Sequence, residues 1–392
     1  MKQCKEKLIV SILFGCSAGI ASYGAQAIEI QVDPWTLNIN GNVNGHLSYV
    51  QCDDSTNVVA GNPLLCTGDD ATSVANGYLP TGIDFGISRT VNDYHVAVHF
   101  AYEGGTVTNG PFNSGGTTES FRGYLTIENE HYGEVKIGRD YGVFGIDVIL
   151  SDMSLLGVGA SAIIKSPLNT TLGSSGYGYI FVDRLAQINY SFPTKNSVSA
   201  TVGVYQPLDP STLGAENTYV GDSGSKTPGF HGRLKYEFDQ GFISSTWLVQ
   251  KVDNEDISET AFAWDVTGKM NFGALSLVAS YHDAKGVGHS GLFFDGIDAQ
   301  GNARNSNGYF VQAMYSFTDT RLGINYGIST LDRNANDPLI NLKQSEKVTF
   351  GAYHSLFEGL TLVAEVSLYE SENNKNQSID NLGVNLGAVY FF

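Results

Sequence analysis

The sequence predicts an all-β protein, an antiparallel up-and-down barrel of about sixteen strands that spans a membrane. Three observations support this prediction. Apolar and polar residues alternate with period two along most of the chain, and the connections between these segments are short and long in turn. After the N-terminal region, no stretch is apolar over the roughly 18 residues of a membrane helix. A soluble sandwich would instead mix its connection lengths.

Residues 1–27 read as a cleaved secretory signal, with lysines first, an apolar core next and an Ala-x-Ala motif at 25–27. The mature chain, residues 28–392, is then a single barrel domain, because no Pro-rich or Ser-rich linker divides it. The competing interpretation is a lipoprotein signal ending at Cys16. The bulky Phe14 disfavours it.

The first alternating segment shows the pattern that defines each predicted strand. Leu37 and Ile39 share one face, and Asn38 and Asn40 lie on the other, because successive strand side chains point to opposite faces. The same template predicts sixteen strands, at 35–50, 80–91, 94–104, 119–130, 133–140, 180–193, 196–206, 229–239, 241–252, 260–272, 274–285, 307–318, 320–331, 345–356, 359–370 and 379–392.

The two faces of these strands differ in polarity. One face is apolar, as at Leu234 and Tyr236, whereas the other carries charged residues, as at Arg233 and Lys235. A soluble barrel has an apolar interior and a polar surface. Charges on the inner face and apolar groups on the outer face are the reverse arrangement, and they imply a water-filled lumen surrounded by lipid. The last segment, 379–392, is then the closing strand.

The whole chain carries a formal charge of −18, and removal of a leader with three lysines and one glutamate would make it more negative. Nucleic acid is therefore excluded as a partner, because phosphate binding needs a basic face.

Two cysteines, Cys52 and Cys66, remain after the leader, and in an exported protein such a pair reads as a disulfide that staples one loop. Metal binding is the weaker alternative, because no histidine or second cysteine pair lies nearby. Four aspartates near this pair could attract calcium, but they lack the spacing of a calcium loop, and we expect no metal site.

Residues 132–157 read YGEVKIGRDYGVFGIDVILSDMSLLG. This run resembles the Gram-negative general porins, whose fifth strand carries G-x-x-x-x-GR-x-YGV, followed by D-V and [ST]-D-M in the third loop. The matching residues are Gly133, Gly138, Arg139, Tyr141, Gly142, Val143, Asp147, Val148, Ser151, Asp152 and Met153. The stretch FVDRLAQINYSFP, residues 181–193, is similar to the sixth strand of that family.

The resemblance implies a homotrimer of barrels in the cell outer membrane, each pore narrowed by an inward-folded third loop. It implies a water-filled channel for passive diffusion of small hydrophilic solutes and ions. Outer-membrane lipid, lipopolysaccharide and the assembly machinery are the implied partners, with Tyr390 and Phe392 as the C-terminal assembly signal. A substrate-specific channel, or a surface receptor or adhesin, is the alternative. No GxSxG elbow or P-loop occurs, so we expect neither an enzyme nor a cofactor.

In that family, acids of the third loop face a row of arginines on the barrel wall. Carried over, the loop acids are Asp147 and Asp152, and the constriction bases are Arg122, Arg139 and Arg184. The general lumen lining includes Lys136, Arg233 and Lys235. The second loop acid of the family is absent here, and Arg139 beside Asp140 could equally anchor the strand end. We expect a weak cation preference, with Asp152 as its largest contributor.

Overall fold

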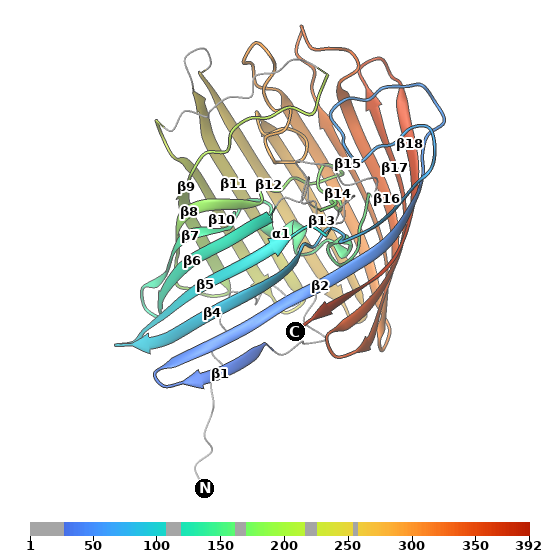
Figure 1. Cartoon of the computed structure of the whole chain (residues 1–392). Coiled ribbons are helices and arrows are strands. Elements are labelled where there is room, and N and C mark those ends of the chain that lie inside the picture. Colours follow the sequence, from blue (N-terminus) through green and yellow to red (C-terminus); the bar gives the residue numbers. More distant parts are fainter. Residues whose placement is uncertain (1–26, 107–118, 161–169, 216–225, 254–257) are drawn as a thin grey trace.

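The computed structural model describes residues 27–106, 119–160, 170–215, 226–253 and 258–392. Within them, sixteen long strands close into one antiparallel barrel, and two short strands extend its sheet (Figure 1). The barrel strands are β2 (Trp35–Gln51), β4 (Thr81–Val91), β5 (Tyr94–Gly104), β6 (Glu119–Asn129), β7 (Gly133–Tyr141), β8 (Arg184–Ser191), β9 (Val198–Tyr205), β10 (Gly229–Phe238), β11 (Gly241–Asp253), β12 (Ser258–Phe272), β13 (Leu275–Lys285), β14 (Asn305–Ser316), β15 (Thr320–Leu331), β16 (Leu342–Phe357), β17 (Leu360–Asn373) and β18 (Ser378–Phe391). Each coincides with one predicted segment, so the predicted fold class is confirmed.

The barrel closes between its last and first long strands. β18 pairs with β2 from Leu382 opposite Gln51 to Phe391 opposite Asn42. Beyond this ladder, Gly41 and Phe392 exchange both backbone hydrogen bonds, with N···O distances of 2.9 and 3.1 Å. The C-terminal segment is thus the closing strand, as predicted, and the barrel has no open edge at this seam.

Two short strands were not predicted, β1 (Ile28–Val32) and β3 (Ala71–Ala75), and both pair with β2. β18 covers one edge of β2 only as far as Asn42, and β1 pairs with residues 35–39 of that edge. On the other edge β4 covers residues 36–42 and β3 pairs with 46–50. The backbone groups of this long strand therefore find partners beyond the barrel itself.

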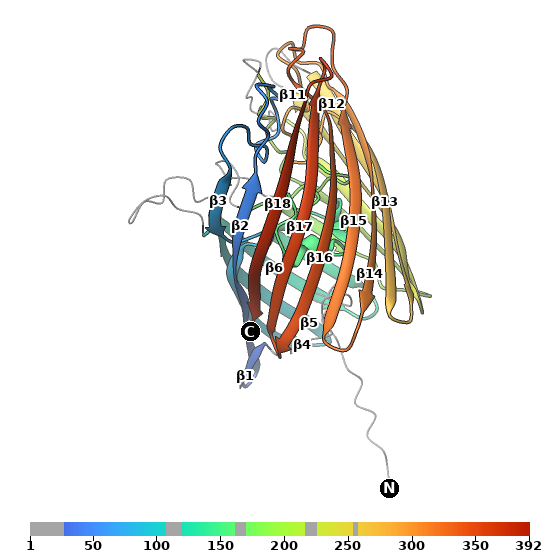
Figure 2. The ribbon, with the colours of Figure 1, turned by 90° about the vertical axis from the view of Figure 1, so that its right-hand side faces the viewer.

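Short and long connections lie at opposite ends of the barrel (Figures 1 and 2). At the short-turn end, Asn92 and Asp93 adopt positive φ angles of 48° and 68°, the left-handed region that Asn and Asp tolerate in tight turns. In bacterial outer-membrane barrels, short turns face the periplasm and long loops face outward. The alternation read from the sequence therefore orients the barrel.

The side chains follow the predicted division into two faces. Leu234 and Phe350 point outward and are 56% and 52% exposed, whereas the inward-facing His231 and Ser345 are fully buried. Among the described residues, no helix is long and apolar enough to cross a membrane. The short helices α1 (Ile146–Ile149) and η2 (Met153–Leu156) both lie in the connection between β7 and β8.

Candidate pore constriction

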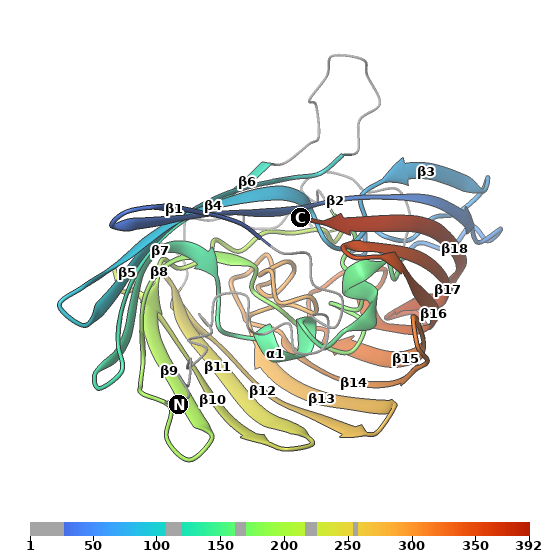
Figure 3. The ribbon, with the colours of Figure 1, turned by 90° about the horizontal axis from the view of Figure 1, so that it is seen from below.

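The connection between β7 and β8, the predicted third loop, lies inside the barrel (Figure 3). Its backbone is held to the inner wall at several strands. Gly145 N donates to Thr246 Oγ1 of β11 (3.0 Å), and Met153 N donates to Gln312 Oε1 of β14 (2.8 Å). Gly178 N donates to Ser329 Oγ of β15 (2.9 Å). The loop therefore follows the β11–β17 side of the lumen.

Glu365 of β17 anchors the turn of this loop. Its Oε2 accepts hydrogen bonds from Val158 N (2.8 Å) and Gly159 N (2.9 Å), and its Oε1 accepts one from Tyr353 (2.6 Å). The loop backbone passes so close that a Cβ on Gly157 would lie 2.1 Å from Glu365 Oε1. Only glycine allows this approach.

Asp152 is buried within the loop, where its carboxylate joins loop to wall. It accepts hydrogen bonds from Ser154 N (2.9 Å), Ser174 N (3.2 Å), Tyr179 Oη (2.9 Å) and Asn325 Nδ2 of β15 (3.2 Å). The side chain also caps the N-terminus of η2. All its accepting capacity is directed at the protein rather than at the lumen, so Asp152 has a clear role in holding the loop.

Asp147 of α1 is ion-paired to β10. Arg233 binds both its oxygens, at 2.6 and 2.7 Å, and Lys235 Nζ lies 3.6 Å from Oδ1. Burial alone would raise the pKa of Asp147, but the hydrogen bonds and charge of Arg233, together with Lys235, hold it below its ordinary value. The carboxylate therefore stays ionised and largely neutralised.

Arg122 of β6 lies in a cluster of three wall carboxylates. Its guanidinium contacts Asp84 of β4 (3.0 Å), Glu103 of β5 (3.2 Å) and Asp140 of β7 (3.2 Å). The residue paired with Arg122 on β5 is Ala101, which is also the partner of Asp84. Its small side chain leaves room for the Asp84 carboxylate to reach across β5. Arg122 thus faces inward, but wall acids rather than loop acids neutralise it.

Arg184 also points inward, although it begins β8. Its Nε donates to Glu103 (2.7 Å), and its guanidinium contacts the Tyr141 hydroxyl (3.0 Å) and the neighbouring Asp183. The backbone turns into the lumen here, with Asp183 at a φ of 56°, so strict alternation no longer decides the direction of the side chain. Lys136 of β7 likewise faces inward and pairs with Asp140 (2.6 Å).

Arg139 lies elsewhere. It shares the outward face of β7 with Ile137, is exposed, and donates through Nε to the carbonyl of Phe121. Side chains two apart on a strand share a face, which places Arg139 opposite the inward-facing Lys136 and Asp140. We therefore leave Arg139 out of the constriction.

The predicted constriction charges that face inward, with their partners, are divided between two sides of the barrel. On β4–β8, Arg122, Lys136 and Arg184 are paired with Asp84, Glu103, Asp140 and Asp183, one more acid than base. On the opposite side, Arg233 and Lys235 share Asp147. The family pattern, in which loop acids face wall arginines across the pore, is thus replaced by charge pairing within each side.

A family model described as Gram-negative porin matches residues 11–374. The chain belongs to the Gram-negative porin family. No curated protein matches it in sequence.

Solved structures resemble this porin over nearly its whole length. The outer membrane channel DcaP of Acinetobacter baumannii has a TM-score of 0.68 at 16% identity, with 94% of this chain and 100% of that chain covered. The anion-selective porin from Comamonas acidovorans has a TM-score of 0.64 at 15% identity, covering 91% and 100%. Salmonella typhi OmpF has a TM-score of 0.63 at 15% identity, covering 93% and 100%. At such identities the likeness establishes the fold.

Membership of this family places the porin in the outer membrane and makes it a channel rather than an enzyme. The fold is consistent with this: a closed barrel presents apolar side chains outward and polar ones to its lumen.

The predicted disulfide of the porin is present, between Cys52 and Cys66. Within the stapled loop, Leu64 is fully buried in a cluster with Tyr177 of the third loop and Tyr369 of β17. Asn62 Nδ2 donates to the Tyr177 hydroxyl of the third loop (2.8 Å). The first and third loops therefore support each other.

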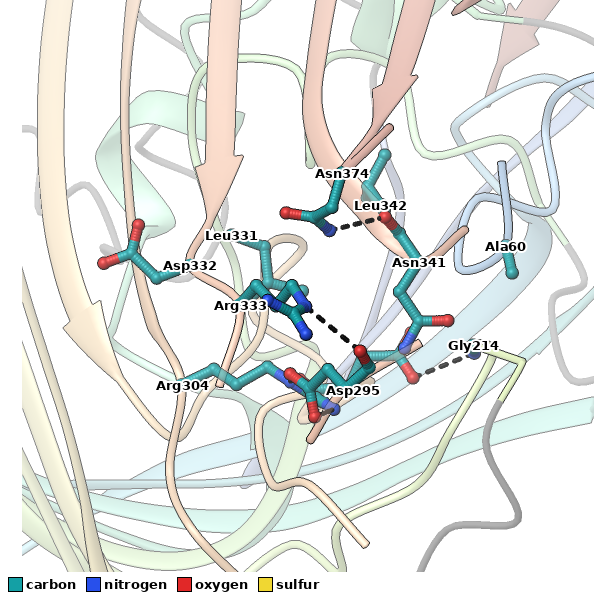
Figure 4. Close-up of a pocket in the computed structure, with 11 residues that line it drawn as sticks. Ala60, Gly214, Asp295, Arg304, Leu331, Asp332, Arg333, Asn341, Leu342 and Asn374 are labelled. Carbon is teal, nitrogen blue, oxygen red and sulfur yellow. Dashed lines mark hydrogen bonds and ion pairs between the residues drawn. The ribbon is translucent and has the colours of Figure 1, made fainter. Parts of the chain in front are cut away.

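At the long-loop end, several loops meet around a pocket (Figure 4). Asp295 Oδ1 accepts from Thr212 Oγ1 (2.7 Å) and from two backbone amides, and Arg304 pairs with Asp337 at 2.7 and 2.9 Å. Burial raises the pKa of the Asp295 carboxyl above its ordinary value. None of the predicted constriction residues lines this pocket. The hydrogen bonds and the ion pair around it join the long loops to one another.

Sequence reasoning missed Glu365, Asp84 and Glu103. A signal for Glu365 existed in its strand: the inward positions of β17 from Thr361 to Ser371 are otherwise uncharged, so the single acid among them stands out. Asp84 and Glu103 occupy inward positions of strands that were predicted correctly. Predicting that they pair with Arg122 requires the register between β4, β5 and β6, which cannot be read from the sequence.

Proposed function

We propose that this porin is a water-filled channel for passive diffusion of small hydrophilic solutes and ions, with a weak cation preference. The observation that carries the proposal is the third loop, hydrogen-bonded along the polar inner wall of a membrane barrel. A loop held in this way narrows the lumen without needing a partner or a ligand. The polar inner face suits hydrated solutes of many kinds.

The weak preference follows from charge pairing. Asp147 and Asp152, the acids expected to select cations, are buried and engaged by Arg233 or by hydrogen bonds. The acids of the β4–β8 wall, in slight excess over their bases, are the better source of cation preference. Remote loop acids count for less, because charges act strongly only within about a Debye length of ~8 to 10 Å.

Liposomes containing the porin should swell in small sugars at rates that fall with increasing sugar size, because a narrowed aqueous lumen sieves solutes by dimension. Protein-free liposomes are the control. Equal swelling with and without the porin would contradict the channel proposal. A swelling rate that saturates for one sugar and is negligible for its isomers would favour the substrate-specific alternative instead.

We further propose a homotrimer, since the family resemblance implies one and the outer wall is broadly apolar. Gently extracted porin should migrate on gels as a heat-modifiable species of about three times the mass of the boiled chain. Migration as a monomer under the same conditions would count against the trimer. The roles of Tyr390 and Phe392 in assembly, and contacts with lipopolysaccharide and the assembly machinery, remain part of this proposal.

A further inference from the structure

The connection between β13 and β14, residues 286–304, also enters the barrel (Figures 1 and 3). Its backbone is hydrogen-bonded to the third loop and to the wall. The Ser290 carbonyl accepts from Phe181 N (3.3 Å) and Ser175 Oγ (2.9 Å), which both belong to the third loop. The Gly288 carbonyl accepts from Ser306 Oγ of β14 (2.8 Å), a buried, inward-facing side chain. The connection therefore lies inside the barrel, against the third loop.

The inner wall behind this connection is apolar towards the long-loop end. Along β12 the inward residues change from Ala261 and Ala263 near that end to Asp265 and Thr267 further in. The apolar wall residues share one buried cluster with side chains of the third loop and of the connection, among them Leu248, Val252, Ile180, Val182, Val287 and Ile297. Apolar side chains that pack in this way exclude water. This part of the lumen is thus filled by protein rather than by solvent.

Phe293 anchors the connection within this cluster, where its ring is fully buried. Its backbone φ is 60°, in the left-handed region that is unfavourable for a bulky side chain. Such a conformation persists only where the surroundings hold it in place. Here Phe293 N donates to the Val287 carbonyl (3.1 Å), and the Phe293 carbonyl accepts from Ser211 N of the β9–β10 connection (3.1 Å). Ring burial and these hydrogen bonds together fix the connection against the wall.

We propose that the β13–β14 connection, anchored by Phe293, is a second inward-folded loop that makes the long-loop entrance of the pore narrower than the short-turn entrance. The inference rests on the proposed channel function and assigns part of its size selection to a second element. The third loop narrows the lumen between two vestibules. The connection reaches the third loop from the long-loop end, so it fills space in the outer vestibule only.

The test is single-channel recording of wild-type porin with polyethylene glycol of graded size added to one side at a time. A polymer that enters a vestibule displaces conducting water and lowers the current, whereas an excluded polymer does not. We expect an intermediate size that lowers the current from the short-turn side but not from the long-loop side. Phe293→Gly should abolish this difference and raise the conductance, because glycine accepts the left-handed φ but lacks the anchoring ring.

Gln300→Cys is the matched control, because Gln300 is an exposed residue of the same connection. It should keep the difference between the two sides. Its biotinylated form identifies the long-loop side, since streptavidin is too large to reach it through the channel. Phe293→Leu retains an apolar anchor and should also keep the difference.

Equal polymer size limits from both sides of wild-type porin would contradict the second loop, and so would a difference that persists in folded Phe293→Gly. The wild-type comparison needs no variant, so it tests the narrower entrance even where Phe293→Gly fails to fold. A wild-type protein that gives no conductance steps would instead overturn the channel function itself.

Discussion

Replacing Arg122 with alanine is expected to increase the cation preference of the channel and to destabilise the barrel by about 3–5 kcal/mol. The guanidinium neutralises Asp84, Glu103 and Asp140, and its side chain is only 6% exposed. Its removal leaves three carboxylates close together, with Lys136 and Arg184 as the remaining bases of the cluster. Breaking a buried pair from one side costs more than the pair contributes, because the remaining charge is desolvated without compensation.

The selectivity effect is measured as the zero-current potential in a potassium chloride gradient, and the stability effect by urea unfolding in detergent micelles. Arg139→Ala is the matched control, since Arg139 lies on the next strand but points outward. It should leave the potential unchanged. Arg122→Lys retains one charge and should fall between wild type and Arg122→Ala. An unchanged potential in a correctly folded Arg122→Ala porin would show that this cluster does not act on passing ions.

Replacing Glu365 with alanine is expected to release the turn of the third loop at Val158 and Gly159 from the wall and so to increase single-channel conductance. The substitution removes the acceptor of two backbone N–H groups and the Tyr353 hydroxyl, all buried. A buried donor without a partner costs about 1–3 kcal/mol, so this turn should move away from the wall to where water reaches those groups.

Conductance and the swelling rates of liposomes in larger sugars report the expected widening. Glu372→Ala is the control on the same strand, because Glu372 pairs with Lys343 near the long-loop end and contacts no residue of the third loop in the described chain. Surface changes of that kind alter stability by about 0.5 kcal/mol or less. If Glu365→Ala keeps wild-type conductance and size sieving, the carboxylate is not what holds the loop in the lumen.

The strands and their order were predictable from the sequence, because a barrel in lipid imposes a local rule on every residue. Leu234 is apolar because it faces lipid, whereas its neighbours Arg233 and Lys235 are polar because they face water. The alternation with period two can therefore be read directly from the sequence. Short turns such as Asn92-Asp93 carry their own conformational signal. The disulfide was predicted from the two cysteines that lie after the predicted leader.

Tertiary structure alone decided how the charges are shared. Asp152 and Asp147 were placed in the third loop by their motif, but only the path of that loop shows the first bound to Asn325 and the second to Arg233. Such contacts depend on the distance between groups that are far apart in the chain, as for the Glu365 carboxylate and Val158 N. The alternation of polar and apolar residues gives no information about that distance. Where the backbone leaves the strand, as at Asp183, even the direction of Arg184 depends on the fold. The sequence by itself therefore determined the barrel and its two faces, and the packing of the third loop decided that Asp147 and Asp152 are engaged by residues of the wall.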